Sequence, residues 1–526
     1  MLKVYNSLTK KIEEFAPGNP PKVSMYVCGV TVYDFCHLGH ARTYAAFDTI
    51  RRHLQKSGYE VEFVQNVTDV DDKIIKRAKE KGVDPLGLAA EFDRNSREDF
   101  ARLGIENAGV YPKVTENIKE IIEFIGKIVE SGNAYANDTG VYFEIGKFRD
   151  YGKLSGQDLE LIKRGARIEV DESKKDPADF ALWKKTGEGE LGWDSPWGRG
   201  RPGWHIECST MSKKHIHGTI DIHGGARDLI FPHHENEIAQ SESYDGQKFV
   251  KYWLHTGFLT VNGEKMAKSL GNFVTIRDAL AKFNQNAGLI RWFFAQTHYR
   301  SPIDYSEEEV KKSEVALKRT LDSIEEMDYF VNQKQGKEKV RDEETRKRAE
   351  ALKAEIKEKM DNDFDTPGAI ATFNDLLRLA NQKTHDDKFA DVDLINELRG
   401  YCRDFLLLFG IKEMQEIVRT KQATISSNAY VKASKESSSS YGAYLVGAEM
   451  FRTKTGKRVT ISKKLDVPAL LGFAKEIGAQ SSDMEDGKQV IETILEARDI
   501  ARGKKDYALA DRIRKFLNEN GIEVED

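Results

Sequence analysis

Short apolar runs alternate with amphipathic stretches in the first part of the chain. Residues 23–27 form an apolar run that predicts a buried strand, and residues 61–67 alternate in a β-rich pattern that predicts a second one. The stretches 41–54 and 72–81 have the apolar spacing of helices. Strands that alternate with helices are typical of parallel pairing, so we predict an α/β catalytic domain with a doubly wound, Rossmann-like parallel sheet.

This rhythm changes twice further along. Residues 113–203 are charged and end in a stretch dense in Gly, Pro and Trp, which predicts an insertion at the edge of the sheet. The α/β pattern resumes at His205, with a strand at 219–223 and a helix that begins near Pro232. From residue 306 to 410, apolar residues recur every three or four positions, which predicts a mainly α-helical bundle.

The C-terminal part has a different composition. A Ser-rich stretch at 426–440 predicts a linker, and residues 421–464 carry nine Lys or Arg against two Glu, a net charge of +7. A hairpin is predicted around Thr455 and Gly456, and two amphipathic helices at 488–502 and 507–518. We therefore divide the chain into a catalytic domain (1–112 and 204–270), an inserted domain (113–203), a linker region (271–305), a bundle (306–412) and a small C-terminal region (413–526).

The overall composition indicates the cellular compartment of the protein more clearly than its function. The net charge of −5 over 526 residues does not identify a nucleic-acid binder, because a local basic surface can be cancelled in the sum. Four cysteines are too few for a disulfide framework in a chain of this length. The sequence has no run of about 20 apolar residues that could cross a bilayer, so we expect a cytoplasmic protein without a membrane partner.

A candidate nucleotide site begins at His37-Leu38-Gly39-His40, between the first strand and its helix. A helix N-terminus offers free N–H groups and a partial positive charge to phosphate. Gly39 would let a nucleotide approach the backbone, and the two imidazoles can donate hydrogen bonds to phosphate oxygens. Taken alone, the motif fits a pair of surface histidines at a helix start equally well.

A second candidate lies about 225 residues downstream, in the run Lys265-Met266-Ala267-Lys268-Ser269. Two lysines three positions apart on a loop can neutralise phosphate charge as the transition state forms, although a lysine-rich surface loop is the simpler explanation of this run by itself. The two motifs together, in this order, resemble the signature pair of class I aminoacyl-tRNA synthetases. Ala267 stands where that family often has serine.

Candidate metal ligands are Cys28, Cys208, His233 and Glu237. If Pro232 starts a helix, His233 and Glu237 lie one turn apart on one face, as a metal site requires, and His234 with Glu237 is a poorer alternative at three-residue spacing. Each residue also has an ordinary explanation as a core cysteine, a capping histidine or a solvated glutamate, so the spacing does not decide.

Longer segments add a more specific resemblance. The chain resembles cysteinyl-tRNA synthetases over about residues 1–415 and 488–526. The segments that carry the resemblance are residues 26–34 with the His37 motif, residues 66–73, 203–208, 221–225 and 231–240, and Asp228. The resemblance implies one Zn²⁺ per chain, held by Cys28, Cys208, His233 and Glu237, that binds the substrate thiolate. A metal suits this task, because an apolar pocket separates cysteine from such close analogues as serine or alanine by only about 1–3 kcal/mol. No separate editing domain is then needed.

The same resemblance implies the rest of the site and the reaction. L-Cysteine would react with ATP and Mg²⁺ to give cysteinyl-adenylate, and the cysteinyl group would pass to the 3′ adenosine of cysteine tRNA. The implied catalytic residues are His37, His40, Lys265 and Lys268, which with Gly39 would bind ATP; the implied substrate-binding residues are Gly29, Thr31, Thr68, Trp204, His223 and Asp228. From the residues alone, a Trp in a Gly- and Pro-rich turn, such as Trp204, is more often a core anchor. An Asp before an apolar run, such as Asp228, is often a turn or cap residue.

The bundle and the C-terminal region are expected to hold the tRNA, with residues 271–305 at its stem and residues 413–526 at its anticodon. The basic stretch suits this role, although a solvated loop explains it as well. Residues 416–487 depart from the family pattern. We expect a monomer. Rival interpretations are a cysteine ligase for a small amino sugar, which would lack the anticodon-binding end, and an inactive synthetase-like tRNA-binding protein, which would carry damaged motifs. A structural zinc protein would leave both nucleotide motifs unexplained.

Overall fold

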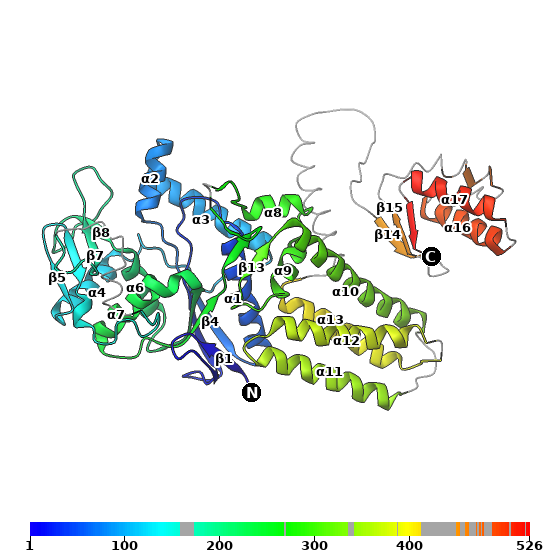
Figure 1. Cartoon of the computed structure of the whole chain (residues 1–526), viewed down its shortest axis with the longest axis horizontal. Coiled ribbons are helices and arrows are strands. Elements are labelled where there is room, and N and C mark those ends of the chain that lie inside the picture. The colour runs from blue at the N-terminus through cyan, green and yellow to red at the C-terminus, as the bar shows by residue number, and fades with distance from the viewer. Residues whose placement is uncertain are drawn as a thin grey trace. The chain divides into compact units, whose positions relative to one another are not determined.

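Four parallel strands form the central sheet of the chain, of which β4 is labelled in Figure 1. Their order is β10 (Val250–Thr256), β9 (Ile220–Ala226), β3 (Lys22–Val27) and β4 (Glu60–Gln65). The chain passes from β3 to β4 on one side and later places β9 on the other side of β3, so the strand order reverses between β3 and β9. In open α/β sheets the crevice at the carboxyl ends of two such strands is where ligands bind.

A computed structural model describes residues 1–157, 173–267, 270–334, 341–386, 388–411, 449–452, 458–461, 470, 473–474, 476–477, 487–503, 506–520 and 522–525. The chain divides into two units, Met1–Thr420 and Lys421–Asp526. Lys268, Ser269, the predicted linker at 426–440 and the predicted turn at Thr455 and Gly456 lie outside the described residues.

Two strands differ from their predicted ranges. β4 ends at Gln65, and the next residues form isolated bridges outside the sheet, Val67 with Lys113 and Thr68 with Thr31. β9 continues to Ala226, past the predicted end at residue 223. Its glycines, which usually weaken a strand, hid this extension. A Cβ on Gly224 would lie 2.1 Å from the Phe47 ring, so glycine lets the first helix pack closely against the strand.

Helices α1 (Leu38–Lys56), α2 (Asp72–Lys81) and α3 (Pro85–Arg102) follow the first strands. The range of α2 is the predicted one. Its ends carry the expected signals, because the Asp71 side chain accepts a hydrogen bond from the Lys73 N–H and Gly82 ends the helix at φ 66°. An N-terminal hairpin, β1 (Lys3–Asn6) with β2 (Lys11–Glu14), lies beside β10.

Residues of the insertion form α4 (Ile118–Glu130), the turn Ile145–Lys147 and an antiparallel sheet of β5 (Ala134–Ala136), β6 (Gly140–Phe143), β7 (Phe180–Lys185) and β8 (Gly200–Pro202). They share a core with α6 (Trp204–His215) and α7 (Glu235–Asp245). Buried Glu235 fastens this part to α7, because its carboxylate accepts hydrogen bonds from the backbone N–H groups of Gly152, Leu154 and Ser155.

The segment before α7 is less regular than predicted. A 3-10 turn, Arg227–Leu229, leads into a wider turn, Ile230–His234, inside which Phe231 has extended backbone angles (φ −137°, ψ 131°). Helix α7 therefore begins at Glu235, three residues after the predicted start at Pro232.

After β10, the strands β11 (Leu259–Val261), β12 (Glu264–Lys265) and β13 (Ile303–Tyr305) form a small sheet. Helices α8 (Ile276–Lys282) and α9 (Ala287–Ala295) lie between β12 and β13 in the sequence. The bundle consists of α10 (Glu307–Gln333), α11 (Glu343–Asp361), α12 (Thr366–Thr384) and α13 (Val392–Leu408). The side chain of Ser306, Asp342, Asp365 or Asp391 caps each helix start.

The C-terminal unit contains an antiparallel sheet of β14 (Glu449–Arg452), β15 (Arg458–Ile461) and β16 (Ile522–Glu525). Helices α16 (Gly487–Gly503) and α17 (Tyr507–Glu519) match the two predicted C-terminal helices closely. Their core includes Phe473, which stacks on Phe516 with ring centroids 3.7 Å apart.

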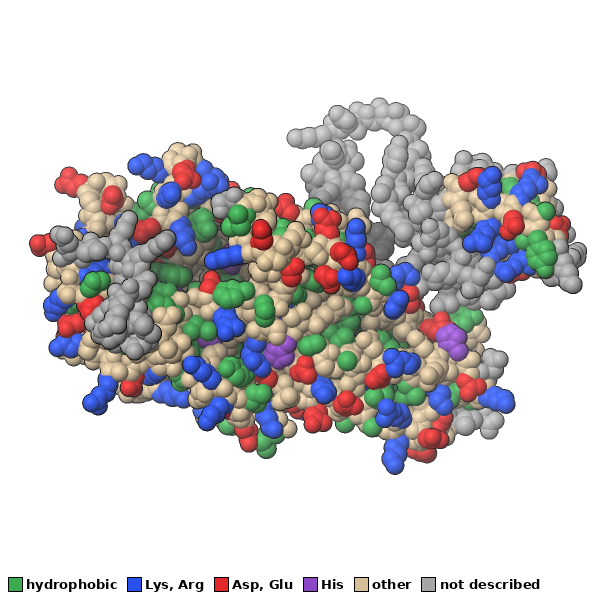
Figure 2. Space-filling view, viewed as in Figure 1, with side chains coloured by type: hydrophobic (Ala, Val, Ile, Leu, Met, Phe, Trp, Pro, Cys, Tyr) green, Lys and Arg blue, Asp and Glu red, His purple; other side chains and the backbone are tan. Residues whose placement is uncertain are grey.

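The surface of the Met1–Thr420 unit carries both signs of charge. Lys and Arg side chains are interspersed with Asp and Glu on the face shown in Figure 2. Within the described ranges, no helix combines the length and apolarity needed to span a membrane.

Candidate active site and metal centre

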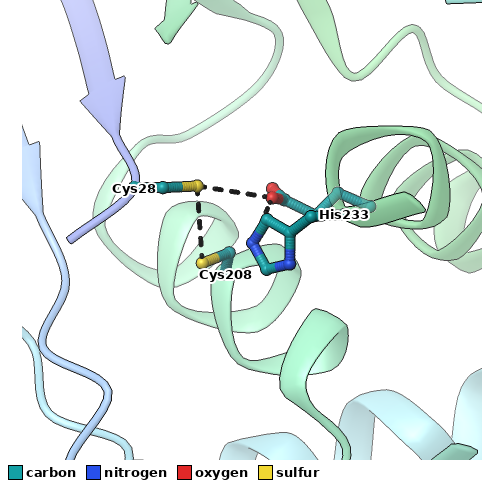
Figure 3. A group of neighbouring side chains, drawn as sticks. Cys28, Cys208 and His233 are labelled. Carbon is teal, nitrogen blue, oxygen red and sulfur yellow. Dashed lines mark hydrogen bonds and ion pairs between the residues drawn. The ribbon is translucent and has the colours of Figure 1, made fainter. Parts of the chain in front are cut away.

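Four predicted metal ligands converge beside β3 and β9. Cys28 follows β3, Cys208 lies on α6, His233 lies in the turn before α7, and Glu237 lies in the first turn of α7; all four are buried. Figure 3 shows Cys28, Cys208 and His233 pointing toward one another. One donor atom from each of the four residues lies within 4.8 Å of the other three.

The spacing of these donor atoms fits a tetrahedral ion. Zinc bonds of about 2.3 Å to sulfur and about 2.0–2.2 Å to nitrogen or oxygen require edges of about 3.8 Å for S–S, 3.6 Å for S–O and 3.4 Å for N–O. The Cys28 and Cys208 Sγ atoms are 3.8 Å apart, and Cys28 Sγ lies 3.5 Å from Glu237 Oε1. The edge from His233 Nε2 to Glu237 Oε1 is shorter, 3.0 Å, because these groups form an ion pair directly.

Electrostatics also favour a cation here. A hydrogen bond from the Cys28 thiol lowers the pKa of Cys208 to about 6, against the effect of burial. Burial lowers the pKa of His233, but Glu237 and Cys208 together outweigh it and raise the value to about 10. Burial likewise opposes ionisation of Glu237, yet the imidazoles of His223 and His233 hold its pKa well below the usual range. Cys208 and Glu237 therefore ionise readily in this cluster, and a cation would stabilise both anions.

Other histidines contact this cluster. His223 Nε2 lies 2.8 Å from Glu237 Oε2, the oxygen that faces away from His233. His234, the weaker candidate from sequence, places Nε2 3.3 Å from Cys28 Sγ and Nδ1 2.7 Å from His255 Nε2. Cys28, His223, His234 and Glu237 thus form a second group with metal-ligand spacing. No local sequence pattern points to His255, which is brought here by pairing of β10 with β9.

Gly29, Thr31 and Thr68 meet at the carboxyl edge of β3 and β4. The Gly29 N–H donates to the Asn66 side-chain oxygen (2.8 Å), and a Cβ on Gly29 would lie 1.6 Å from the Asn66 backbone oxygen. Thr31 bridges Thr68, whose hydroxyl donates to the buried carboxylate of Glu207 (3.0 Å). Glu207 immediately precedes the candidate ligand Cys208, and no sequence pattern singled it out.

The remaining substrate candidates are placed differently. The Trp204 ring packs on the His233 ring, with centroids 4.3 Å apart, and the His223 ring stacks on Trp253 at 4.5 Å. Trp204 thus contacts the candidate ligand His233, and His223 contacts the candidate ligand Glu237. Asp228 is exposed in the turn Arg227–Leu229, which connects β9 to the segment that bears the ligands.

His37 and His40 form a reciprocal cap at the start of α1. The Gly39 N–H donates to His37 Nδ1 (3.0 Å), and the His37 N–H donates to His40 Nδ1 (3.3 Å). Because each Nδ1 accepts a hydrogen bond, each neutral ring carries its proton on Nε2. Burial lowers the pKa of His40 and keeps that ring neutral. A Cβ on Gly39 would lie 2.8 Å from the His37 ring, so glycine is needed for this cap.

Both nucleotide motifs lie side by side. The Leu38 N–H donates to the Val274 carbonyl (3.1 Å) and the Ile276 N–H to the Cys36 carbonyl (3.0 Å), which joins the start of α1 to the segment after the lysine loop. Lys265 is exposed at the end of β12. The Ala267 N–H donates to the Asn272 side chain (2.8 Å), so both ends of the loop are held together. Lys268 lies outside the described residues.

Comparison with known proteins first defines the class. Residues 14–315 match the family model of the "tRNA synthetases class I (C) catalytic domain", and residues 355–412 match the DALR domain. The fold resembles that of Mycobacterium tuberculosis methionyl-tRNA synthetase in complex with methionyl-adenylate, with a TM-score of 0.59 over 74% of this chain and 90% of that one, at 15% identity. The chain has the class I aminoacyl-tRNA synthetase fold, which confirms the predicted fold class.

Sequence relatives then define the family. The chain is 43% identical to a cysteine–tRNA ligase of Pelotomaculum thermopropionicum over 525 residues, covering 100% of this chain and 98% of that one. It is 50% identical to the cysteine–tRNA ligase of Thermococcus gammatolerans over 416 residues, covering 78% and 87%. The chain belongs to the cysteine–tRNA ligase family. The match to the Pelotomaculum relative spans almost the whole of both chains.

Proposed function

We propose that this chain joins L-cysteine to the 3′ adenosine of cysteine tRNA in two ATP-dependent steps, and that one Zn²⁺ selects the amino acid. Cys28, Cys208, His233 and Glu237 would hold the ion. The observation that carries the proposal is the close spacing of these four buried donors, with two of their edges matching a tetrahedral zinc site, in a chain of the cysteine–tRNA ligase family.

The donor set explains why the site would choose cysteine. When bound, the zinc supplies a soft Lewis acid that favours a thiolate over a neutral hydroxyl. The protein would supply the rest of the selection: Trp204 and His223 limit the space beside the cluster, and Gly29, Thr31 and Thr68 shape the adjacent edge of the sheet. Asp228 is our candidate for the substrate ammonium group.

In the first step, the cysteine carboxylate would attack the α-phosphate of ATP, and pyrophosphate would leave. The capped start of α1 orients the Nε2–H groups of His37 and His40, and Gly39 leaves the backbone accessible, so this segment is suited to the phosphates. Lys265 and Lys268 would neutralise charge on the departing pyrophosphate, together with Mg²⁺. Catalysis would rest on positioning and charge stabilisation.

In the second step, a ribose hydroxyl of the 3′ adenosine would attack the carbonyl of the adenylate, and AMP would leave. We assign tRNA binding to the linker region 271–305, the bundle 306–412 and the C-terminal region 413–526, with the anticodon at the last of these. The catalytic domain at 1–112 and 204–270 would carry the chemistry, with 113–203 as its insertion. We further propose that the chain acts as a monomer in the cytoplasm.

ATP–pyrophosphate exchange and tRNA charging test this proposal in sequence. We expect exchange with cysteine, little with serine or alanine, and transfer of cysteine to cysteine tRNA. Equal exchange with serine would refute the zinc-based selection. Exchange without charging, combined with transfer to an amino sugar, would favour the small-molecule ligase, and the absence of both activities in zinc-loaded protein would favour an inactive tRNA-binding protein.

A further inference from the structure

His205, the second residue of α6, directly contacts a proposed metal ligand. Its Nδ1 lies 2.9 Å from the Nδ1 of His233. The other ring nitrogen of His233, Nε2, lies 3.0 Å from Glu237 Oε1 and thus faces the cluster. His233 therefore has one nitrogen on the metal side and the other on His205.

Hydrogen-bond inventory fixes the direction of this contact. A neutral imidazole has one N–H group and one lone pair. If Nε2 of His233 gives its lone pair to a metal, Nδ1 must carry the proton and donate it to His205. His205 must then accept with Nδ1 and carry its own proton on Nε2.

Three parts of the fold hold His205 in place. Phe180, on β7 of the insertion, contacts its ring edge to face, with centroids 5.6 Å apart and planes at 83°. The backbone oxygen of His205 accepts a hydrogen bond from Gln240 on α7 (2.9 Å), and Gln240 also donates to Ser209 on α6 (2.8 Å). His205 is thus fixed between the insertion and both helices that carry metal ligands.

We propose that His205 is a positioning residue for the metal: it accepts the Nδ1 proton of His233, which sets the tautomer and the ring direction of that ligand. This inference rests on the proposed metal site. A ligating histidine commonly donates its second N–H to such a partner, and loss of the partner typically weakens metal binding about 10–100-fold.

Zn²⁺ affinity tests the role of His205 without relying on activity. In competition with a chromophoric chelator, full-length His205→Leu should bind Zn²⁺ about 10–100-fold more weakly than wild type. His205→Asn keeps an acceptor oxygen near the position of Nδ1 and should recover most of the affinity. His217→Leu removes an exposed histidine just after α6 and should bind as wild type does.

Unchanged Zn²⁺ affinity in folded His205→Leu would overturn the proposal, as would equal losses in the Leu and Asn variants. A wild-type chain that takes up no Zn²⁺ would instead refute the metal site itself. If the Leu variant does not fold, long-range ¹H–¹⁵N correlation on zinc-loaded wild type decides, because the proposal requires the proton of His205 on Nε2, and a proton on Nδ1 would overturn it.

Discussion

Gly29→Ala should displace the proposed metal ligand Cys28 from the rest of the site. A Cβ at this position would lie 1.6 Å from the Asn66 backbone oxygen and 2.7 Å from the Asn66 carbonyl carbon. Ordinary contact between such atoms begins near about 3.2 Å, so the two segments must separate by about 1.5 Å. Neither atom belongs to a flexible side chain, so the backbone next to Cys28 or Asn66 has to move.

A shift of this size exceeds what the site tolerates. Metal–ligand distances are held within about 0.2 Å, and a misplacement of about 1 Å in an active site can cost about 10²-fold in rate. We expect Gly29→Ala to lose bound zinc and to reduce cysteine-dependent pyrophosphate exchange about 100-fold, mainly through KM for cysteine. The fold should survive, because overpacking typically costs about 1–3 kcal/mol.

Gly126→Ala provides a matched control. Gly126 lies in α4, and a Cβ there meets no atom within 4 Å. This substitution should raise stability by up to about 1 kcal/mol and leave zinc content and exchange unchanged. If Gly29→Ala retains wild-type zinc content and exchange, the close approach of Gly29 to Asn66 does not position the ligand, and the reasoning is wrong.

Three further predictions concern the ligands, the bundle and the C-terminal end. Cys208→Ser should strongly reduce bound zinc and cysteine-dependent exchange without creating exchange with serine; metal analysis of the purified variant checks this, and unchanged cysteine affinity in metal-free protein would contradict the zinc role. Burial raises the pKa of Asp361, but hydrogen bonds and charge from His53 and Lys357 outweigh it and lower the value from 3.8 to about 2. The ionised Asp361 therefore contributes to folding stability above about pH 4, and this contribution is lost as the pH falls toward 2. The destabilisation caused by Asp361→Asn, at most about 1–2 kcal/mol because Lys357 is exposed, should therefore shrink in thermal unfolding between pH 5 and pH 2.5; a constant difference would exclude this linkage. Deleting residues 416–526 should spare adenylate formation but impair tRNA charging, and equal loss of both steps would contradict a separate tRNA-reading end.

The sequence predicted correctly those helices whose two ends are determined by nearby residues. The range of α2 followed from its apolar spacing, and the structure shows Asp71 and Gly82 capping its two ends. By contrast, β9 was predicted too short, because only its packing against Phe47 explains why a strand contains Gly224. The wide turn before α7, in which Phe231 is extended, also has no signal in the apolar spacing.

The candidate metal site shows the same limit. Cys28 and Cys208 are 180 positions apart, so spacing could not join them, and only the family resemblance selected the four ligands. The partners of these ligands were harder to find. His205 contacts the ligand candidate His233, and His255 contacts the neighbouring His234; both do so through helix and strand packing, so they could not be distinguished from other histidines before the fold was known.

The hydrogen bonds of Glu235 bear on any attempt to make a smaller enzyme. A chain that joins residue 112 directly to residue 204 would keep all four cysteines, both signature motifs and the whole parallel sheet. It would also strip a buried carboxylate of the three N–H groups that solvate it, two positions before Glu237. Ile206 and Ala239, which pack in the core shared with the insertion, would lose their apolar partners as well, so the shortened protein would be expected to lose order first at α7, the helix that carries the proposed ligand Glu237.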